Sequence, residues 1–170
     1  RIKSSVGHLT HILNDFLSLE RLESRKVNPE SGTFDISLFL QRMADDTDGQ
    51  RKPGQNIVYR HEGPATVVAD QNILRNVITN LLSNAIKYSE DQVTMRSMVK
   101  DGMLTIEVED KGIGIPESAQ SNIFGKFFRA GNAGHIQGTG LGLMIVKRYV
   151  ELLGGSIGFV STQDQGTCFT

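Results

Sequence analysis

Residues 76–89, with the sequence NVITNLLSNAIKYS, decide the predicted fold. Apolar residues recur here at helical spacing, which predicts a helix over residues 71–88 that packs against a broad surface such as a sheet. The same spacing places Asn76, Asn80 and Asn84 on one face of that helix. Each asparagine costs a helix roughly 0.5 kcal/mol relative to alanine, so three in register require a reason.

The segments around this helix predict an α+β fold. Residues 92–110 alternate apolar and polar side chains around Asp101-Gly102, which is typical of a hairpin of two strands. The remaining predicted elements are an amphipathic helix over residues 36–52, short strands at 56–63 and 66–70, a helix at 141–155, and strands at 156–160 and 166–170. This order predicts a two-layer α/β sandwich, in which helices cover one face of a mixed, mostly antiparallel sheet, preceded by one long helix.

The first residues predict a separate unit. Apolar residues from Ile2 to Phe16 are spaced alternately by four and three, as on a helix that packs along a partner helix. Proline and glycine in the following segment end this helix, so we predict a helical unit at 1–28 and a second domain at 33–170. Because the pattern is already under way at Arg1, we expect a piece of a longer protein.

The composition excludes several classes of function. A formal net charge of −1 and the absence of a dense basic run argue against binding nucleic acid. The single cysteine, Cys168, forms no internal disulfide or metal-ligand pattern, which favours a reducing, cytoplasmic setting. No apolar run has the length of a membrane span, so we expect no direct membrane contact from these residues, although the parent protein can still be anchored in a membrane.

Two glycine-rich segments predict a site for a flat ligand and an anion. In DKGIGIP, Asp110 ends a predicted strand, and Gly112 and Gly114 let the backbone turn sharply and approach a ligand. In GTGLGL, residues 138–143, three glycines precede a helix whose first N–H groups and dipole favour a phosphate. The second segment is neither a Walker A loop nor a Rossmann fingerprint, because it lacks the GxxxxGK[ST] string and no strand precedes it.

Together with the asparagine helix, these segments resemble the ATP-binding catalytic domain of sensor histidine kinases, within the wider gyrase, chaperone, histidine kinase and mismatch-repair ATPase fold. The resemblance rests on NLLSNAIKYS (80–89) for the N box, DKGIGIP (110–116) for the first glycine box, IFGKFFRA (123–130) for the phenylalanine box, GTGLGL (138–143) for the second glycine box and GTCF (166–169) for the terminal strand. Residues 1–26 are similar to the second helix of the hairpin that serves dimerisation and phosphotransfer.

The resemblance implies roles along the asparagine helix. It assigns Asn84 to Mg²⁺, and a neutral amide oxygen suits a hard cation already surrounded by phosphate charge. Asn80 is implied to face the same triphosphate, where hydrolytic relatives carry a glutamate that activates water. Because an amide is not a general base, Asn80 favours transfer to a protein over hydrolysis. Lys87 and Tyr88 are implied contacts to the phosphates and the nucleotide, and Asn76 receives no role.

The glycine boxes and the chain end complete the implied nucleotide site. Asp110 resembles the aspartate that accepts the adenine amino group, which selects ATP because guanine presents a carbonyl there. Thr167 is implied to assist at the adenine. The other implied nucleotide-binding residues of the two glycine boxes are Gly112, Gly114, Gly138, Thr139, Gly140, Leu141 and Gly142.

Residues 116–137 resemble the lid that folds over the bound nucleotide. Lys126 and Arg129 are its candidates for the γ-phosphate, where a cation neutralises developing charge. The implied catalytic residues are therefore Asn80, Lys87 and Arg129.

The phenylalanine box supplies the apolar residues of this lid. We expect Phe124, Phe127 and Phe128 to pack the lid against the core or the neighbouring helical domain rather than to contact the nucleotide. The sequence departs from the family at Gly125, where an acid is common.

The resemblance implies the catalytic domain of a two-component sensor kinase, which transfers the γ-phosphoryl group of ATP to a histidine on a helical hairpin and thence to a response regulator. His8 and His11 lack the acid that usually follows the family's acceptor, His61 lies in a predicted strand and His135 in the lid. We therefore expect this chain to bind ATP with Mg²⁺ without autophosphorylating. The implied partners are the hairpin of the same kinase, a receiver domain, and a second copy in the intact homodimer.

Two alternatives remain open at this point. One is another enzyme of the same fold, either a hydrolytic ATPase or a serine kinase that regulates a sigma factor, against which Asn80 and the N-terminal helix argue. The other is a degenerate nucleotide-binding scaffold, against which the intact glycine boxes, Asn84 and Asp110 argue.

Overall fold

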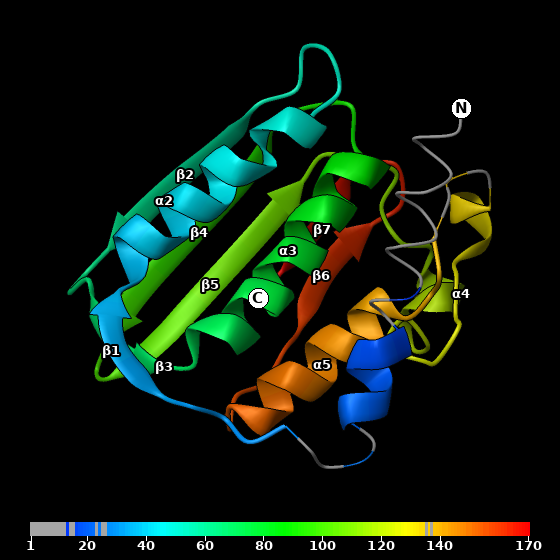
Figure 1. The fold of residues 1–170 in the computed structure, drawn as a ribbon. Coiled ribbons are helices and arrows are strands. Elements are labelled where there is room, and N and C mark those ends of the chain that lie inside the picture. Colours follow the sequence, from blue (N-terminus) through cyan, green and yellow to red (C-terminus); the bar gives the residue numbers. More distant parts are fainter. Residues whose placement is uncertain (1–12, 14–15, 23, 25–26, 135, 137) are drawn as a thin grey trace.

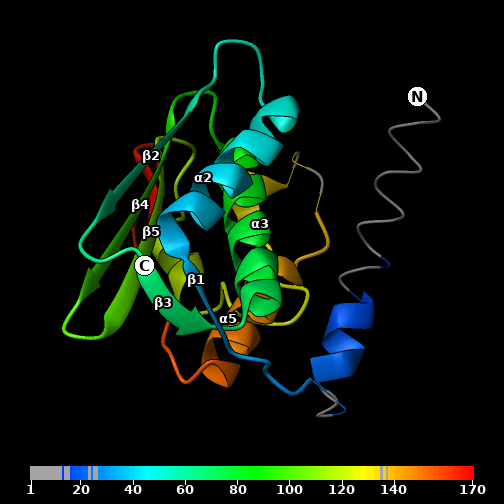
Figure 2. The ribbon, with the colours of Figure 1, turned by 60° about the vertical axis from the view of Figure 1, so that its left-hand side comes forward.

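In the computed structural model, residues 13, 16–22, 24, 27–134, 136 and 138–170 are described. Helices α2, α3 and α5 lie on one face of a five-stranded sheet (Figure 1), and the two layers stand side by side in Figure 2. The α+β sandwich predicted from the sequence is thereby confirmed. The helices are α2 (Ile36–Thr47), α3 (Gln71–Tyr88), α4 (Glu117–Gln120) and α5 (Gly142–Leu152), with 3₁₀ turns η1 (Asp48–Gln50) and η2 (Gly131–Ala133).

The main sheet has the strand order β2-β4-β5-β7-β6. Strands β2 and β4 pair in parallel, and the other neighbours pair antiparallel. Asp101 and Gly102, both with positive φ, join β4 to β5, as the predicted hairpin requires. The strands are β1 (Gly32–Asp35), β2 (Ile57–Glu62), β3 (Thr66–Ala69), β4 (Val93–Lys100), β5 (Met103–Asp110), β6 (Phe159–Thr162) and β7 (Gly166–Phe169).

Strands β1 and β3 form a separate antiparallel pair that the sequence did not predict. The sequence predicts a linker at the segment of β1, but this segment pairs with β3, with Gly32 opposite Ala69. The two short strands around Gly63-Pro64 do form, yet they do not pair with each other, because β2 joins β4 and β3 joins β1. Helix α2 also ends at Thr47, five residues before the predicted end at 52.

The long helix predicted over residues 1–28 is only partly described. Residues 16–22 are helical; Leu19 is 3% exposed and belongs to the core, whereas Phe16 is 57% exposed. The remainder, including His8 and His11, lies outside the described residues, so this helix and its domain boundary stay predictions. No helix in the described part of the chain combines the length and hydropathy that crossing a bilayer requires.

Helix α3 is the centre of the core. It packs against α2, α5 and β5, and its apolar stripe is as the sequence predicts. Its buried residues are Ile73, Leu74, Val77, Ile78, Leu81, Leu82, Ala85 and Ile86. Burying each large aliphatic side chain contributes about 1.5–3 kcal/mol, so the position of α3 in the sandwich is strongly determined.

Polar groups hold both ends of α3. At the N-terminus, Asp70 Oδ1 accepts the N–H groups of Asn72 and Ile73 at 2.8 and 3.0 Å, and Asp70 Oδ2 accepts the Glu30 N–H at 2.6 Å. Burial alone would raise the pKa of Asp70, but the three donors together lower it below its usual value. The Asp70 carboxylate therefore caps α3 and binds the segment that leads into β1.

The C-terminus of α3 is held by two residues that precede β2. Lys52 Nζ donates to the carbonyls of Lys87 and Ser89 at 3.1 and 2.8 Å and to Glu90 Oε1 at 2.6 Å. Gln55 is 3% exposed, and its amide donates to the Ser89 carbonyl at 3.2 Å. A cation at this end also suits the helix dipole.

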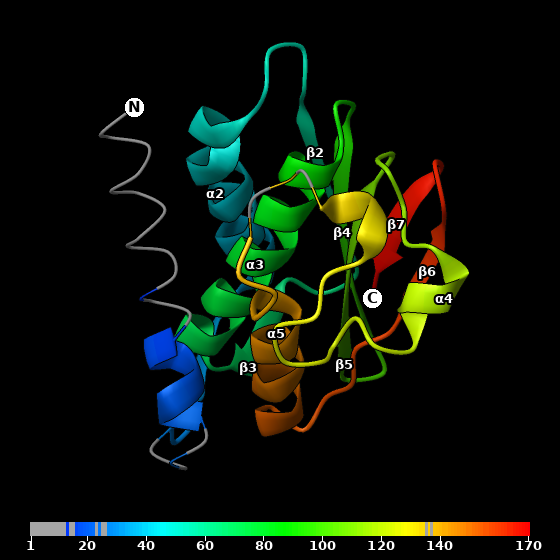
Figure 3. The ribbon, with the colours of Figure 1, turned by 90° about the vertical axis from the view of Figure 1, so that its right-hand side faces the viewer.

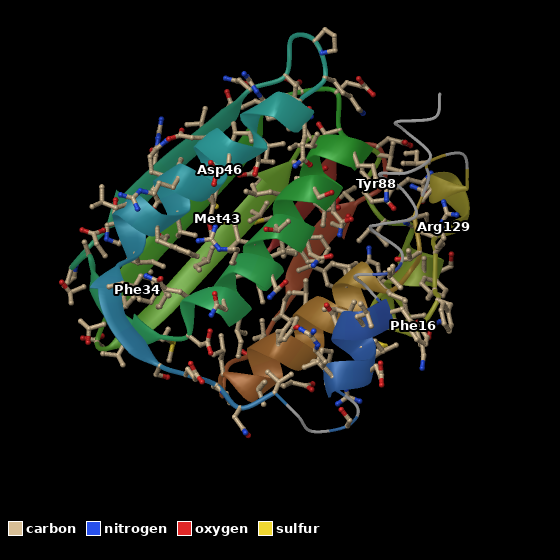
Figure 4. The ribbon with its side chains drawn as sticks, viewed as in Figure 1. Phe16, Phe34, Met43, Asp46, Tyr88 and Arg129 are labelled. Carbon is tan, nitrogen blue, oxygen red and sulfur yellow. The ribbon has the colours of Figure 1, made fainter. Side chains whose placement is uncertain are left out.

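We expect Asp70→Ala to lower the free energy of unfolding by about 1–3 kcal/mol, because the cap is lost and the Glu30 N–H loses its partner. The contribution of Asp70 should be present above pH 3.8, its ordinary pKa, and be lost as the pH falls through the lowered folded-state pKa. Urea unfolding at pH 7 and pH 3 measures both effects. Asp46→Ala, at an exposed position on α2 (Figure 4), is the control, and equal midpoints for the two variants at pH 7 would contradict the assignment.

Candidate functional site

A cavity of about 390 Å³ lies between the C-terminal half of α3, the loop after β5, the lid and the start of α5. Figure 3 shows the lid, in yellow, running beside α3 and into α5. Predicted site residues that line the cavity are Asn80, Asn84, Lys87, Tyr88, Asp110, Gly114, Arg129, Gly138, Thr139, Gly140, Gly142 and Thr167. With Thr167 from β7, the fold gathers residues from five separate stretches of sequence around one cavity.

The asparagines of α3 differ in their contacts. Asn76 and Asn80 each donate through Nδ2 to the carbonyl four residues earlier, at 2.8 and 3.0 Å. Asn76 lies outside the cavity, so its side chain contacts its own helix rather than a ligand site. Asn80 Oδ1 faces the first residue of α5, since a Cβ on Gly142 would lie 2.9 Å from it. Asn84, the third member of the stripe, is half-buried and lines the cavity.

The last turn of α3 brings a cation to the second glycine box. Lys87 Nζ lies 4.5 Å from the centroid of the Tyr88 ring, a cation–π distance. A Cβ on Gly138 would lie 2.7 Å from Lys87 Nζ. Lys87 and the glycine-rich segment before α5 are therefore adjacent, which is the arrangement that a phosphate requires.

The loop after β5 packs its backbone directly against the end of α3. Ile113 donates its N–H to the Tyr88 carbonyl at 3.1 Å. A Cβ on Gly112 would lie 2.2 Å from the same Tyr88 oxygen, so only glycine fits there. Gly112 is thus placed beneath the site rather than on the cavity wall.

Asp110 is a buried acid that faces the cavity, with 8% of its surface exposed. Its Oδ1 accepts the Gly112 N–H at 2.8 Å. Burial raises the pKa of Asp110 to about 6, although hydrogen bonds from the N–H groups of Gly112 and Thr167 act in the opposite direction and Glu109 adds to the rise. At neutral pH the carboxylate is therefore mostly ionised and has the chemistry of a hydrogen-bond acceptor on the cavity wall.

The lid places Arg129 on the cavity wall. Figure 4 shows Arg129 and Tyr88 at the same end of the molecule, and both line the cavity. Arg129 Nη2 donates to the Ala133 carbonyl at 2.8 Å and to the Ile136 carbonyl. One nitrogen of the guanidinium therefore holds the lid turn, while the fork has further N–H donors to offer.

The three phenylalanines of the lid have different surroundings. Phe124 packs on the sheet, with its ring centroid 6.0 Å from that of Phe159 in β6, as expected. Phe127 is 62% exposed, with φ at 61°, and Lys126 Nζ lies 5.8 Å from its ring centroid. Phe128, which was expected only to pack, lines the cavity. The lid thus contributes an aromatic wall to the site.

Three predicted site residues do not line the cavity. Gly112 supports it as described above, and Leu141 is 3% exposed in the core, with its N–H bound to Thr139 Oγ1 at 3.2 Å. Lys126 is exposed beside Phe127. His61 also lies elsewhere, against Ser97 Oγ at 2.8 Å in the sheet, and His135 is outside the described residues.

Sequence reasoning missed part of the cavity wall. The additional lining residues are Ser83, Ile113, Ile115, Ile123, Phe128, Ala130, Asn132, Ala133, Leu143 and Phe169. Most are small or apolar residues within or beside the recognised motifs, and only their position next to Asp110 or the glycines offered a signal. Asn132 lies within the predicted lid at 116–137 but outside the quoted motifs, so nothing distinguished it from its neighbours in the lid.

The donor set fits a magnesium ion only in the company of a phosphate ligand. The described residues contain no group of three His, Cys, Asp or Glu side chains that could hold a metal. Asn84 supplies one neutral oxygen at the cavity wall. Mg²⁺ usually keeps several waters and binds through few protein groups together with substrate phosphates, so Asn84 would be its protein ligand there, with a neutral oxygen in place of the usual carboxylate.

Asp110→Asn should remove a pH dependence of stability. Between pH 3.8, the ordinary pKa, and about 6, the Asp110 carboxyl of the folded protein holds a proton that the unfolded chain has released. Proton binding therefore stabilises the folded state; this contribution is full below pH 3.8 and is lost as the pH rises through about 6. We expect the variant to be more stable than wild type at pH 7.5, by at most about 3 kcal/mol, and equal to it near pH 4. Urea unfolding with Asp46→Asn as control measures this, and a difference that is constant with pH would contradict it.

Comparisons with known proteins are consistent with this geometry. The chain is 32% identical over 178 residues to the aerobic respiration control sensor protein ArcB of Escherichia coli (strain K12), which covers 99% of this chain and 23% of ArcB. It is 36% identical over 177 residues to the circadian input-output histidine kinase CikA of Synechococcus elongatus, covering 99% of this chain and 24% of CikA. The chain therefore spans only a small part of the length of these relatives.

A solved structure and a family match agree with these relatives. The crystal structure of full-length ShkA in complex with AMPPNP superposes with a TM-score of 0.85 at 29% identity, over 98% of this chain and 35% of that chain. The family described as histidine kinase-, DNA gyrase B-, and HSP90-like ATPase matches residues 69–170, which is more than half of the chain. The protein therefore belongs to the histidine kinase-, DNA gyrase B- and HSP90-like ATPase family.

Proposed function

We propose that this chain is the ATP-binding catalytic domain of a two-component sensor histidine kinase, which transfers the γ-phosphoryl group of ATP to a histidine on a helical hairpin, and thence to a response regulator. The observation that carries the proposal is one cavity lined by the buried acid Asp110, the glycine-rich start of α5 and the amide face of α3. The relatives ArcB and CikA, a sensor protein and a histidine kinase by name, support it, as does the AMPPNP complex of ShkA.

The cavity accommodates a nucleotide in one orientation. The ionised Asp110 carboxylate accepts a hydrogen bond from the adenine amino group, with Thr167 beside it, and Ile113 and Ile115 supply apolar walls for the ring. Guanine presents a carbonyl oxygen at the place of that amino group, so a carboxylate rejects it.

The phosphates then extend toward α5. The first N–H groups of α5 and the glycines before it attract negative charge, and Lys87 adds a cation at Gly138. Arg129 approaches from the lid and neutralises charge on the γ-phosphate. Asn84 would hold a magnesium ion, which neutralises phosphate charge when it is bound.

Transfer to a protein is favoured over hydrolysis. Asn80 lines the cavity, where a hydrolytic ATPase of this fold needs a carboxylate to activate water, and an amide does not accept that proton. Positioning and charge neutralisation are therefore the contributions of this chain to catalysis. A scaffold role is disfavoured because Asn84, Asp110 and the glycine loops all reach the same cavity.

The acceptor histidine, the receiver domain and the second copy of the intact homodimer belong to the proposal as partners. None of the four histidines of this chain fits the acceptor, because His8 and His11 lack the acid that usually follows it, His61 belongs to β2, and His135 falls in the lid segment. The chain alone should therefore bind ATP without labelling itself.

A longer protein that includes the preceding hairpin helix tests the proposed reaction. With radiolabelled ATP and Mg²⁺ it should acquire acid-labile, alkali-stable phosphate on histidine, and Lys87→Ala should reduce the initial rate at least about tenfold, because a phosphate-binding cation is lost. Arg60→Ala, at an exposed position on β2, is the matched control. Release of inorganic phosphate without protein label would instead support the hydrolytic alternative, and nucleotide binding with neither product would support the scaffold.

A further inference from the structure

Asn132 joins the lid to the loop after β5. It lies in η2, and its Nδ2 donates to the Gly114 carbonyl at 2.9 Å and to the Ile113 carbonyl at 3.3 Å. Two carbonyl oxygens on one side of the amide require the NH₂ group there, so the orientation of the amide is determined by its surroundings. Its Oδ1 must therefore point away from these carbonyls.

That Oδ1 atom is buried and has no hydrogen-bond partner among the described residues, although Asn132 lines the cavity. A buried carbonyl oxygen normally has a donor, and a native one without a donor needs an explanation. Oδ1 is closed to water in this structure, so a ligand in the cavity that Asn132 lines must displace a neighbouring side chain to supply the missing N–H or O–H group.

The chemistry of the acceptor selects the part of the ligand. Phosphate oxygens of a nucleotide carry negative charge and no hydrogen at neutral pH, so a carbonyl oxygen close to them would be repelled. The carbonyls that hold Asn132 belong to Ile113 and Gly114, which follow Asp110 by three and four residues. Both facts place Asn132 at the nucleoside end.

We propose that Asn132 is a nucleoside-recognition residue, whose Oδ1 accepts a hydrogen bond from the base amino group or a ribose hydroxyl of the nucleotide. This inference rests on the proposed ATP-binding function. Because the same amide holds the lid to the loop after β5 through Nδ2, recognition of the nucleoside also stabilises the lid in place over it.

Binding of ATP and three analogues to wild type and to Asn132→Ala, measured by calorimetry, tests the proposal. The analogues are 2′-deoxy-ATP, 3′-deoxy-ATP and purine riboside triphosphate, each of which lacks one nucleoside donor. Removal of the donor that Asn132 binds should weaken binding to wild type by about three- to tenfold, the usual worth of a neutral hydrogen bond. In Asn132→Ala the loss should vanish if that analogue is a deoxy analogue. If it is purine riboside triphosphate, the loss should shrink by the same factor to the part caused by Asp110, which binds the same amino group.

Asn122→Ala, at an exposed position in the same lid that does not line the cavity, is the control and should leave every affinity ratio at its wild-type value. The proposal is overturned if Asn132→Ala binds ATP more weakly but shows the wild-type ratio for all three analogues, since Asn132 would then only hold the lid. The proposal also fails on a second combination of results. In it, wild type binds both deoxy analogues as tightly as ATP, and Asn132→Ala loses as much affinity for purine riboside triphosphate, relative to ATP, as wild type does. Failure of wild type to bind ATP at all would refute the proposed function instead.

Discussion

The site depends on a backbone contact between the end of α3 and the loop after β5. The Tyr88 carbonyl accepts the Ile113 N–H at 3.1 Å, and the approach is so close that a Cβ on Gly112 would lie 2.2 Å from the same oxygen. Lys52 and Gln55 bind the carbonyls next to it. The contact joins the helix layer to the end of β5, the central strand of the sheet, and the cavity opens at this junction. A residue larger than glycine at this loop position would separate the two layers.

This junction brings together groups of unlike chemistry that the sequence keeps apart. Asp110 comes from the end of β5, Lys87 from the end of α3 and Arg129 from the lid, and all three line one cavity. The acid and the cations arise on different elements, so one cavity offers both a hydrogen-bond acceptor and positive charge. A nucleotide presents the complementary groups, since its base donates hydrogen bonds and its phosphates carry negative charge.

Local patterns in the sequence predicted much of this architecture. Helix α3 spans the predicted residues, because its apolar stripe and its Asp70 cap are encoded within one helix. The β4–β5 hairpin likewise follows from its alternation and its Asp-Gly turn. The pairing of β1 with β3 and the parallel pairing of β2 with β4 were not predictable in this way, because their registers join residues distant in the sequence. Phe128 and Asn132 were missed because a lid has no periodicity, and which of its residues reach the cavity depends on how the whole loop packs.

The central claim is that the cavity holds adenine at Asp110, and calorimetric titration of this chain with ATP and GTP at pH 7.5, before and after Asp110→Asn, tests it most directly. At that pH the carboxylate is ionised, because burial raises the pKa of Asp110 only to about 6. Wild type should bind ATP at least about tenfold more tightly than GTP, and Asp110→Asn should abolish ATP binding while the circular dichroism spectrum remains that of the folded protein. An unchanged affinity for ATP in a folded Asp110→Asn protein would contradict the account.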